Sequence, residues 1–277
     1  MKRLIISDYR KFFRDKLFLV VCILAVVFAA TTPLLYAALI GAVGSIDPTA
    51  EELLSESMSA KGQFFGAFSF GNNLGLIAPL LIGVILSKDF SFGTIRNKII
   101  SGHTRNSIFL SLFIVCATTL FGIILVHALL TLGISLFFFD YQSTPFQMAD
   151  FWYLMESLLF QLLVYLFTAA LVSWLCVTRR NVGMIIVLYI AIVLGSTMVA
   201  GILQVVIIAL QFEPDAEKAL RILNFFQRIN IFNSSATIGL GSSYNSKEVW
   251  YYVLTPLLGT GGLLTLGMRR FAKKDIK

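Results

Sequence analysis

The sequence predicts an all-α, polytopic membrane protein, and three observations lead to that fold class. The mean hydropathy is +0.84, and 57% of the 277 residues are hydrophobic while 13% are charged, a composition that a water-soluble globule cannot bury. Six apolar runs are each long enough to cross a hydrocarbon core, which needs roughly 20 helical residues. These runs lack the alternation of barrel strands of about ten residues, so their backbones can satisfy every hydrogen bond in lipid only as helices.

The six apolar runs define the expected transmembrane helices of a single domain that covers residues 1–277. They lie at about 17–44, 66–87, 107–138, 151–178, 182–211 and 249–268. Trp152 and Trp250 fall at one predicted interface with water and Trp174 falls at the other, as the aromatic belts of membrane proteins do.

Basic residues set the expected orientation of these helices. Seventeen of the 22 lysines and arginines fall on one side, within 1–16, 88–105, 179–180 and 269–277. Loops rich in lysine and arginine stay in the cytoplasm, so we expect a multi-pass plasma-membrane protein with both termini cytoplasmic. The net charge of +7 is then a topology signal, and it does not indicate nucleic acid as a partner.

The amino-terminal segment 1–16 is expected to form an interfacial helix. Apolar side chains recur at helical spacing on one face, while basic side chains fill the rest. Over residues 4–17 the apolar positions are Ile5, Tyr9, Phe12, Phe13 and Leu17, and the basic ones are Arg10, Lys11, Arg14 and Lys16. This helix either anchors the chain to membrane lipids, anionic ones included, or acts as a lever that contacts a cytoplasmic partner.

The loop 88–106 between the second and third helices predicts a short helix exposed to the cytoplasm. Ile95, Ile99 and Ile100 form an apolar stripe beside Arg96 and Lys98, and Gly102 is well placed to end the helix. Such a basic and apolar knob could fit a groove on a soluble protein. The alternative is a solvated linker.

The segment 212–247 is the longest expected stretch outside the membrane. Pro214 is expected to open an amphipathic helix, whose apolar residues recur at a spacing of about 3.6 residues. Those residues are Ala216, Ala219, Leu220, Leu223, Phe226 and Ile229. Ser234 and Ser235, together with the glycines and serines of 239–243, are expected to form a flexible return to the last helix.

A few polar residues inside the apolar runs are candidates for a substrate pathway, because burying them in lipid is costly. They are Asn72, Asn73, His127, Glu156, Gln161 and Gln204. His127 could equally be a neutral imidazole bonded to a neighbouring helix, and Glu156 could reach the outer water.

No motif indicates catalysis within this chain. HExxH and GxSxG are absent, and the three cysteines (Cys22, Cys116 and Cys176) lie inside apolar runs without metal-ligand spacing. No GxxxxGK[ST] phosphate loop occurs in the sequence. We therefore expect neither catalytic, cofactor nor metal sites here, and any ATP must be bound by another polypeptide.

The segment from Gly93 to Arg105, GTIRNKIISGHTR, resembles the membrane subunits of type-2 ATP-binding-cassette (ABC) exporters, as does the carboxyl end from Gly267 to Phe271. This resemblance implies that 88–106 is a cytoplasmic coupling helix docked on an ATPase, and that 212–247 is an outer gate. Carried over to this sequence, the implied docking residues are Phe92, Ile95, Arg96, Lys98 and Ile99, with Arg179 and Arg180 as a smaller second contact.

The resemblance further implies a permease subunit that exports a hydrophobic or amphipathic substrate. Its partners would be an ATPase subunit that binds ATP and Mg and a second copy or a related permease, alongside membrane lipids. The many phenylalanines and few charges suit an apolar or amphipathic substrate better than a sugar or an ion. The resemblance to exporters of this size with short outer loops implies antimicrobial or toxin peptides. A secondary carrier or a sensory membrane protein without an ATPase is the alternative.

Overall fold

The computed structural model describes residues 1–44, 59–91, 93–141, 147–179, 181–213, 216–239 and 249–273. Within these ranges every regular element is a helix and no strand occurs, so the all-α prediction is confirmed for the described residues. The helices are α1 (Lys2–Phe13), α2 (Lys16–Gly44), α4 (Ala60–Phe68), α5 (Asn73–Ser91), α6 (Thr94–Ile100), α7 (Arg105–Ser135), α8 (Met148–Thr178), α9 (Val182–Leu210), α10 (Glu217–Ile229), α11 (Ile231–Gly239) and α12 (Val249–Lys273).

Five of the described helices are long and apolar enough to cross a membrane, namely α2, α7, α8, α9 and α12. A sixth span is counted if α5 and the short α6 are taken as one bent segment. The chain thus has the helices of a multi-pass membrane protein.

One boundary prediction is wrong: the run 66–87 is interrupted around Ser69–Asn72, which separates α4 from α5.

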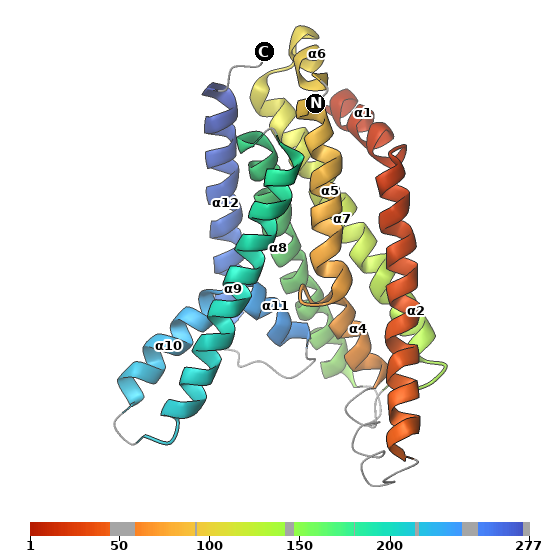
Figure 1. Cartoon of the computed structure of the whole chain (residues 1–277), viewed down its shortest axis with the longest axis vertical. Coiled ribbons are helices and arrows are strands. Elements are labelled where there is room, and N and C mark those ends of the chain that lie inside the picture. Colours follow the sequence, from red (N-terminus) through yellow and green to blue (C-terminus); the bar gives the residue numbers. More distant parts are fainter. Residues whose placement is uncertain are drawn as a thin grey trace.

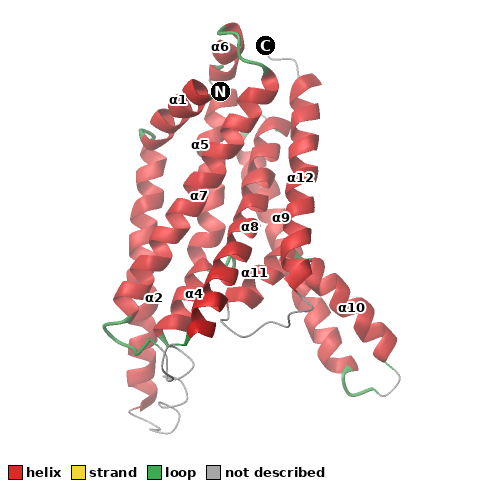
Figure 2. Ribbon diagram, turned by 180° about the vertical axis from the view of Figure 1, so that it is seen from behind, coloured by secondary structure: helices red, strands yellow, loops and turns green. Residues whose placement is uncertain are grey.

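The helices form an elongated bundle with α7 and α8 at its centre. Within an apolar 18-residue segment of each helix, the buried share is 61% in α7 and 67% in α8. It is 22% in α2, 22% in α9 and 17% in α12. Figures 1 and 2 show α1, α6 and the carboxyl end of α12 at one end of the bundle, with α4 and α11 toward the other. The peripheral helices therefore present their apolar surfaces outward, as lipid or another membrane protein requires.

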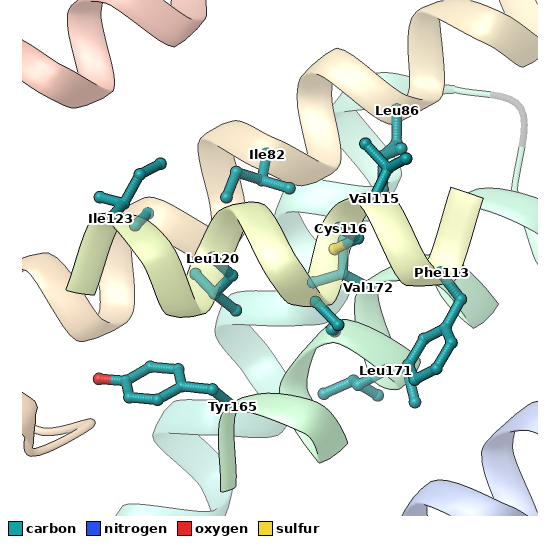
Figure 3. Close-up of a cluster of buried hydrophobic side chains, with 14 of the residues drawn as sticks. Ile82, Leu86, Phe113, Val115, Cys116, Leu120, Ile123, Tyr165, Leu171 and Val172 are labelled. Carbon is teal, nitrogen blue, oxygen red and sulfur yellow. The ribbon is translucent and has the colours of Figure 1, made fainter. Parts of the chain in front are cut away.

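The core is built where α5, α7 and α8 meet. Figure 3 shows Ile82 of α5 and Leu120 of α7 in this cluster with Val172 of α8; all three are at most 1% exposed. Cys116 and Cys176 are buried thiols, and Cys116 lies in the same cluster (Figure 3). They pack as small apolar residues, as expected from the sequence.

The predicted flexible return at Ser234–Ser235 is wrong, because both residues lie in α11. Asn230 ends α10, and its side-chain oxygen accepts hydrogen bonds from the backbone N–H groups of Phe232 (3.2 Å) and Asn233 (3.3 Å). This side chain satisfies the first free donors of a new helix, so the chain turns and continues as α11. Pro214 and residues 240–243 lie outside the described residues.

Gly75 allows the start of α5 to approach the backbone of the preceding interruption. A Cβ at this position would lie 2.7 Å from the carbonyl oxygen of Phe70 and 2.8 Å from that of Ser69. Backbone atoms cannot move aside cheaply, so we expect Gly75→Ala to destabilise the protein by about 1–3 kcal/mol. The measurement is the melting temperature of the purified protein in detergent.

The matched control is Gly133→Ala on α7, where an added Cβ meets nothing within 4 Å. Alanine favours a helix by up to about 1 kcal/mol over glycine, so this variant should melt at or slightly above the wild-type temperature. Equal melting temperatures for Gly75→Ala and wild type would contradict the close approach.

Candidate functional site

The end of the bundle that holds α1 and α6 contains a group of paired charges, which we call the α1–α6 charge cluster. Its members come from α1, the α1–α2 link, the end of α5 and α6. They are Asp8, Lys11, Asp15, Lys88, Asp89 and Lys98.

Lys98 of α6 is the centre of this cluster. Its ammonium group lies 2.6 Å from Asp8 Oδ1 and 3.0 Å from Asp89 Oδ2, and its side chain is 11% exposed. Asp89 also pairs with Lys11, and Asp8 Oδ2 accepts a hydrogen bond of 2.7 Å from Ser111 Oγ on α7. Lys98 thereby ties α6 to α1 and α5, and through Asp8 to α7.

A second ion pair joins the α1–α2 link to α5. Lys88 Nζ lies 2.6 Å from Asp15 Oδ2, while Asp15 Oδ1 accepts the backbone N–H of Leu17 at 3.0 Å and so caps the start of α2. Burial alone would raise the pKa of Asp15. The hydrogen bonds from Lys88 and Leu17 and the charges of Lys88 and Lys11 outweigh burial, and they lower its pKa below the ordinary value.

The surroundings of Lys11 favour its neutral form, whereas those of Asp15 favour its charged form. Burial and the nearby ammonium group of Lys98 lower the pKa of Lys11, although Asp8 and Asp15 oppose the change. Two lysines that share Asp89 as a partner therefore repel each other. The cluster holds both near one carboxylate because Asp8 supplies a further negative charge.

Glycines define both ends of α6. Gly93 precedes the helix with a φ of +70°, and Gly102 follows it with a φ of +86°. The N–H of Gly102 bonds to the carbonyl of Ile99 at 2.9 Å, and that of His103 bonds to the carbonyl of Lys98 at 3.2 Å. This pair of bonds is a Schellman motif, in which glycine adopts the left-handed conformation without steric cost.

The helix α6 turns only part of the predicted docking set outward. Ile95 is 2% exposed, Ile99 packs partly buried against the core, and Lys98 faces the charge cluster. Arg96 is exposed and Ile100 is 73% exposed. Positions 95, 98 and 99 share one helix face, so they attach α6 to the bundle while Arg96 and Ile100 remain accessible.

The other predicted docking residues are only partly described. Arg179 is exposed just after α8, whereas Phe92 and Arg180 lie outside the described residues. Asn181 caps α9 by accepting the N–H of Gly183 at 2.9 Å. The docking role of this loop and of α6 stays a prediction.

At the opposite end, polar side chains satisfy the backbone of the interruption between α4 and α5. Tyr165 of α8 donates to the carbonyl of Phe68 at 2.9 Å, and the N–H of Phe70 donates to Ser235 Oγ of α11 at 2.7 Å. Asn72 Nδ2 donates to the carbonyl of Gly66 at 3.3 Å. In lipid these groups would otherwise lack partners, and this is why the interruption is tolerated.

Gln161 joins α11 to α8 by two reciprocal hydrogen bonds. Its Oε1 accepts from Ser235 Oγ at 2.8 Å, and its Nε2 donates to the carbonyl of Ser235 at 2.9 Å. Both residues are at most 1% exposed. Gln161 and Asn72, predicted as pathway candidates, therefore support the interrupted segment.

His127 and Gln204 make their described contacts elsewhere in the bundle. His127 Nδ1 lies 2.9 Å from the carbonyl oxygen of Ala25 on α2, which matches the alternative of an imidazole bonded to a neighbouring helix. Gln204 of α9 is exposed and bonds to Gln227 of α10. Glu156 is exposed on α8, and the side chain of Asn73 is outside the described set. The five candidates whose side chains are described do not converge on one site.

Sequence reasoning missed most of the α1–α6 charge cluster. Asp8, Asp15, Lys88 and Asp89 were not among the predicted site residues. One signal was present: Lys98 is spaced three residues from Ile95, which places a charge on the apolar face of α6 and calls for a buried partner. Among the described residues, no group of histidines, cysteines and carboxylates could hold a metal ion.

No family model matches the sequence, and no curated protein matches it. Function must be argued from the residues and their arrangement.

Replacing Lys98 should reveal whether the charge cluster holds α6. We expect Lys98→Met to lower stability by about 3–5 kcal/mol, because Asp8 and Asp89 would keep buried charges with one partner fewer. Arg96→Met, two residues away on the exposed face, is the matched control and should change stability by less than about 0.5 kcal/mol. Thermal unfolding in detergent measures both, and equal losses would refute the assignment.

The Lys88–Asp15 pair should make stability depend on acidic pH. Because the native pKa of Asp15 is lowered, its contribution is present above the unfolded pKa of about 3.9 and is lost as pH falls toward the native pKa. Wild type should melt above Asp15→Asn at pH 6, and the difference should shrink between about pH 4 and pH 3. A difference that stays constant over this range would contradict the pairing.

Proposed function

We propose that this chain is the permease subunit of an ATP-driven exporter and that α6 is its contact with a separate ATPase subunit. The observation that carries the proposal is the way α6 is attached to the bundle on one face and exposed on the other. This helix of seven residues lies at the extreme end of the bundle (Figure 1). Lys98 and Ile95 fix it to the bundle, while Arg96 and Ile100 face outward.

A helix mounted in this way can transmit force. A displacement of α6 would act on α1 through the Lys98–Asp8 pair, on α5 through Lys98–Asp89, and on α7 through Ser111 and Asp8. These connections lead from one exposed surface into several helices at once. ATP-driven closure of a partner dimer could thereby change the packing of the whole bundle. The resemblance of the Gly93–Arg105 segment to type-2 ABC exporters supports this proposal.

ATP and Mg would be held by the partner subunit, since this sequence has no phosphate loop. A second copy of the chain, or a related permease, would complete the assembly. The outward apolar surfaces of α2, α9 and α12 suit such a neighbour as well as lipid. The basic residues of α1, α6 and the end of α12 favour placing this end of the bundle in the cytoplasm.

The substrate we favour is an apolar or amphipathic molecule, with antimicrobial or toxin peptides as the leading class. The spans carry few charges and many apolar side chains outward. In this account α10 and α11 form an outer gate, since α11 is fixed to α8 by Gln161 and borders the interruption between α4 and α5.

The competing function is a secondary carrier or a sensory membrane protein that needs no ATPase. A carrier of this kind would transport when purified alone into vesicles. A permease subunit would transport only after a phosphate-loop ATPase and ATP are added.

Reversing the charge at Arg96 should uncouple export from ATP hydrolysis. We expect Arg96→Glu to reduce export at least about tenfold. An arginine that pairs with a carboxylate of the ATPase would become a glutamate that the same carboxylate repels. Export is measured as survival of the native host, or as uptake of labelled peptide into inside-out vesicles.

The matched control is Arg269→Glu, which reverses an exposed charge near the carboxyl end of α12, outside the proposed docking helix and gate. Both variants should reach the membrane and elute as single species. If Arg96→Glu exports as well as wild type, α6 is not the docking helix.

A further inference from the structure

An apolar groove runs along the outside of the bundle between α1, α2 and α7. Its volume is about 410 Å³. Tyr9 and Phe13 of α1 lie at one end, Ala25 of α2 lines one wall, and α7 lines the other from Thr118 to Leu130. No charged residue lines it.

The length of the groove matches one leaflet of a bilayer. The twelve-residue step from Thr118 to Leu130 corresponds to about 18 Å along α7 at 1.5 Å per residue. Half of a hydrocarbon core is about 15 Å. A single acyl chain can therefore extend along this wall from the interface toward the middle of the membrane.

The α7 wall of the groove leaves open space for an occupant. At Gly122, which lines the groove, an added Cβ would meet no atom within 4 Å. The hydroxyl of Thr118 is already engaged, since it donates back to the carbonyl of Ile114 at 2.7 Å.

Two exposed arginines of α1 adjoin residues at the mouth of the groove. Arg10 and Arg14 are exposed and directly follow the groove residues Tyr9 and Phe13 on α1. The two acids of this segment are already engaged, Asp8 by Lys98 and Asp15 by Lys88. Within the part of the chain that the structure describes, no ion pair is formed by either arginine.

Aromatic side chains frame the same mouth. The rings of Tyr9 and Phe13 stack with centroids 5.9 Å apart, and Phe18 meets Phe13 edge-on at 4.9 Å. The Tyr9 hydroxyl bonds to Thr118 and so joins α1 to α7. Aromatic residues with a polar tip commonly lie at the level of lipid headgroups.

We propose that this groove binds one acyl chain of an anionic phospholipid, with the headgroup phosphate held by Arg10 and Arg14. The apolar walls exclude water from the acyl chain. The two guanidinium groups favour a lipid headgroup whose net charge is negative. The bound lipid would pack α1 against α2 and α7. Since Asp8 of α1 forms an ion pair with Lys98 of α6, a bound lipid would also stabilise the position of α6. The proposal does not depend on an ATPase partner.

Native mass spectrometry of the full chain in mild detergent tests this proposal. Dioleoylphosphatidylglycerol and dioleoylphosphatidylcholine are added at equal concentration, and retained adducts are counted. We expect one phosphatidylglycerol to be retained about tenfold more than phosphatidylcholine. Equal retention of the two lipids would overturn the proposal.

Two sets of variants locate the bound lipid. Gly122→Leu fills the groove and should reduce the phosphatidylglycerol adduct about tenfold, whereas Gly133→Leu, also in open space on α7, should leave it unchanged. Arg10→Gln with Arg14→Gln should remove the preference for phosphatidylglycerol while the groove still accepts an acyl chain. Wild-type retention by Gly122→Leu, or an unchanged preference without the two arginines, would exclude this site.

Discussion

The structure depends on a lysine held between two buried carboxylates at one end of the bundle. Lys98 joins Asp8 and Asp89, and Lys11 shares Asp89, so the four charges balance. Removing Lys98 would leave the buried carboxylates of Asp8 and Asp89 with one partner fewer, which costs far more than a surface pair contributes. This constraint makes α1, α5 and α6 one mechanical unit, and the proposed coupling role of α6 rests on that unit.

The opposite end is organised by hydrogen bonds to backbone. The interruption between α4 and α5 exposes peptide groups inside the bundle, and Tyr165 and Ser235 satisfy those of Phe68 and Phe70. Gln161 then holds Ser235 in place. A helix can be broken at membrane depth only where protein supplies such partners. Both ends therefore rely on a few polar contacts between distant segments, while apolar packing of α5, α7 and α8 fills the space between them.

Local features of the sequence predict the helices well and their long-range partners poorly. Continuous apolar runs predict α2, α7, α8, α9 and α12, and Gly102 marks the stop after α6, because both signals depend on neighbouring residues. The pairing of Lys98 with Asp8 spans 90 positions and that of Gln161 with Ser235 spans 74, and no local pattern encodes either. The break near Ser69 was missed for the same reason, since its partners come from α8 and α11.

The most direct test of the account is photo-crosslinking from position 100, the most exposed residue of α6 among those predicted to form its apolar stripe. A photoreactive amino acid replaces Ile100 in the native host, and crosslinked proteins are identified by mass spectrometry. The account predicts a crosslink to a soluble protein that carries a GxxxxGK[ST] phosphate loop, and loss of that crosslink when Arg96 is changed to glutamate. Crosslinks only to lipid or to further copies of this chain would contradict it.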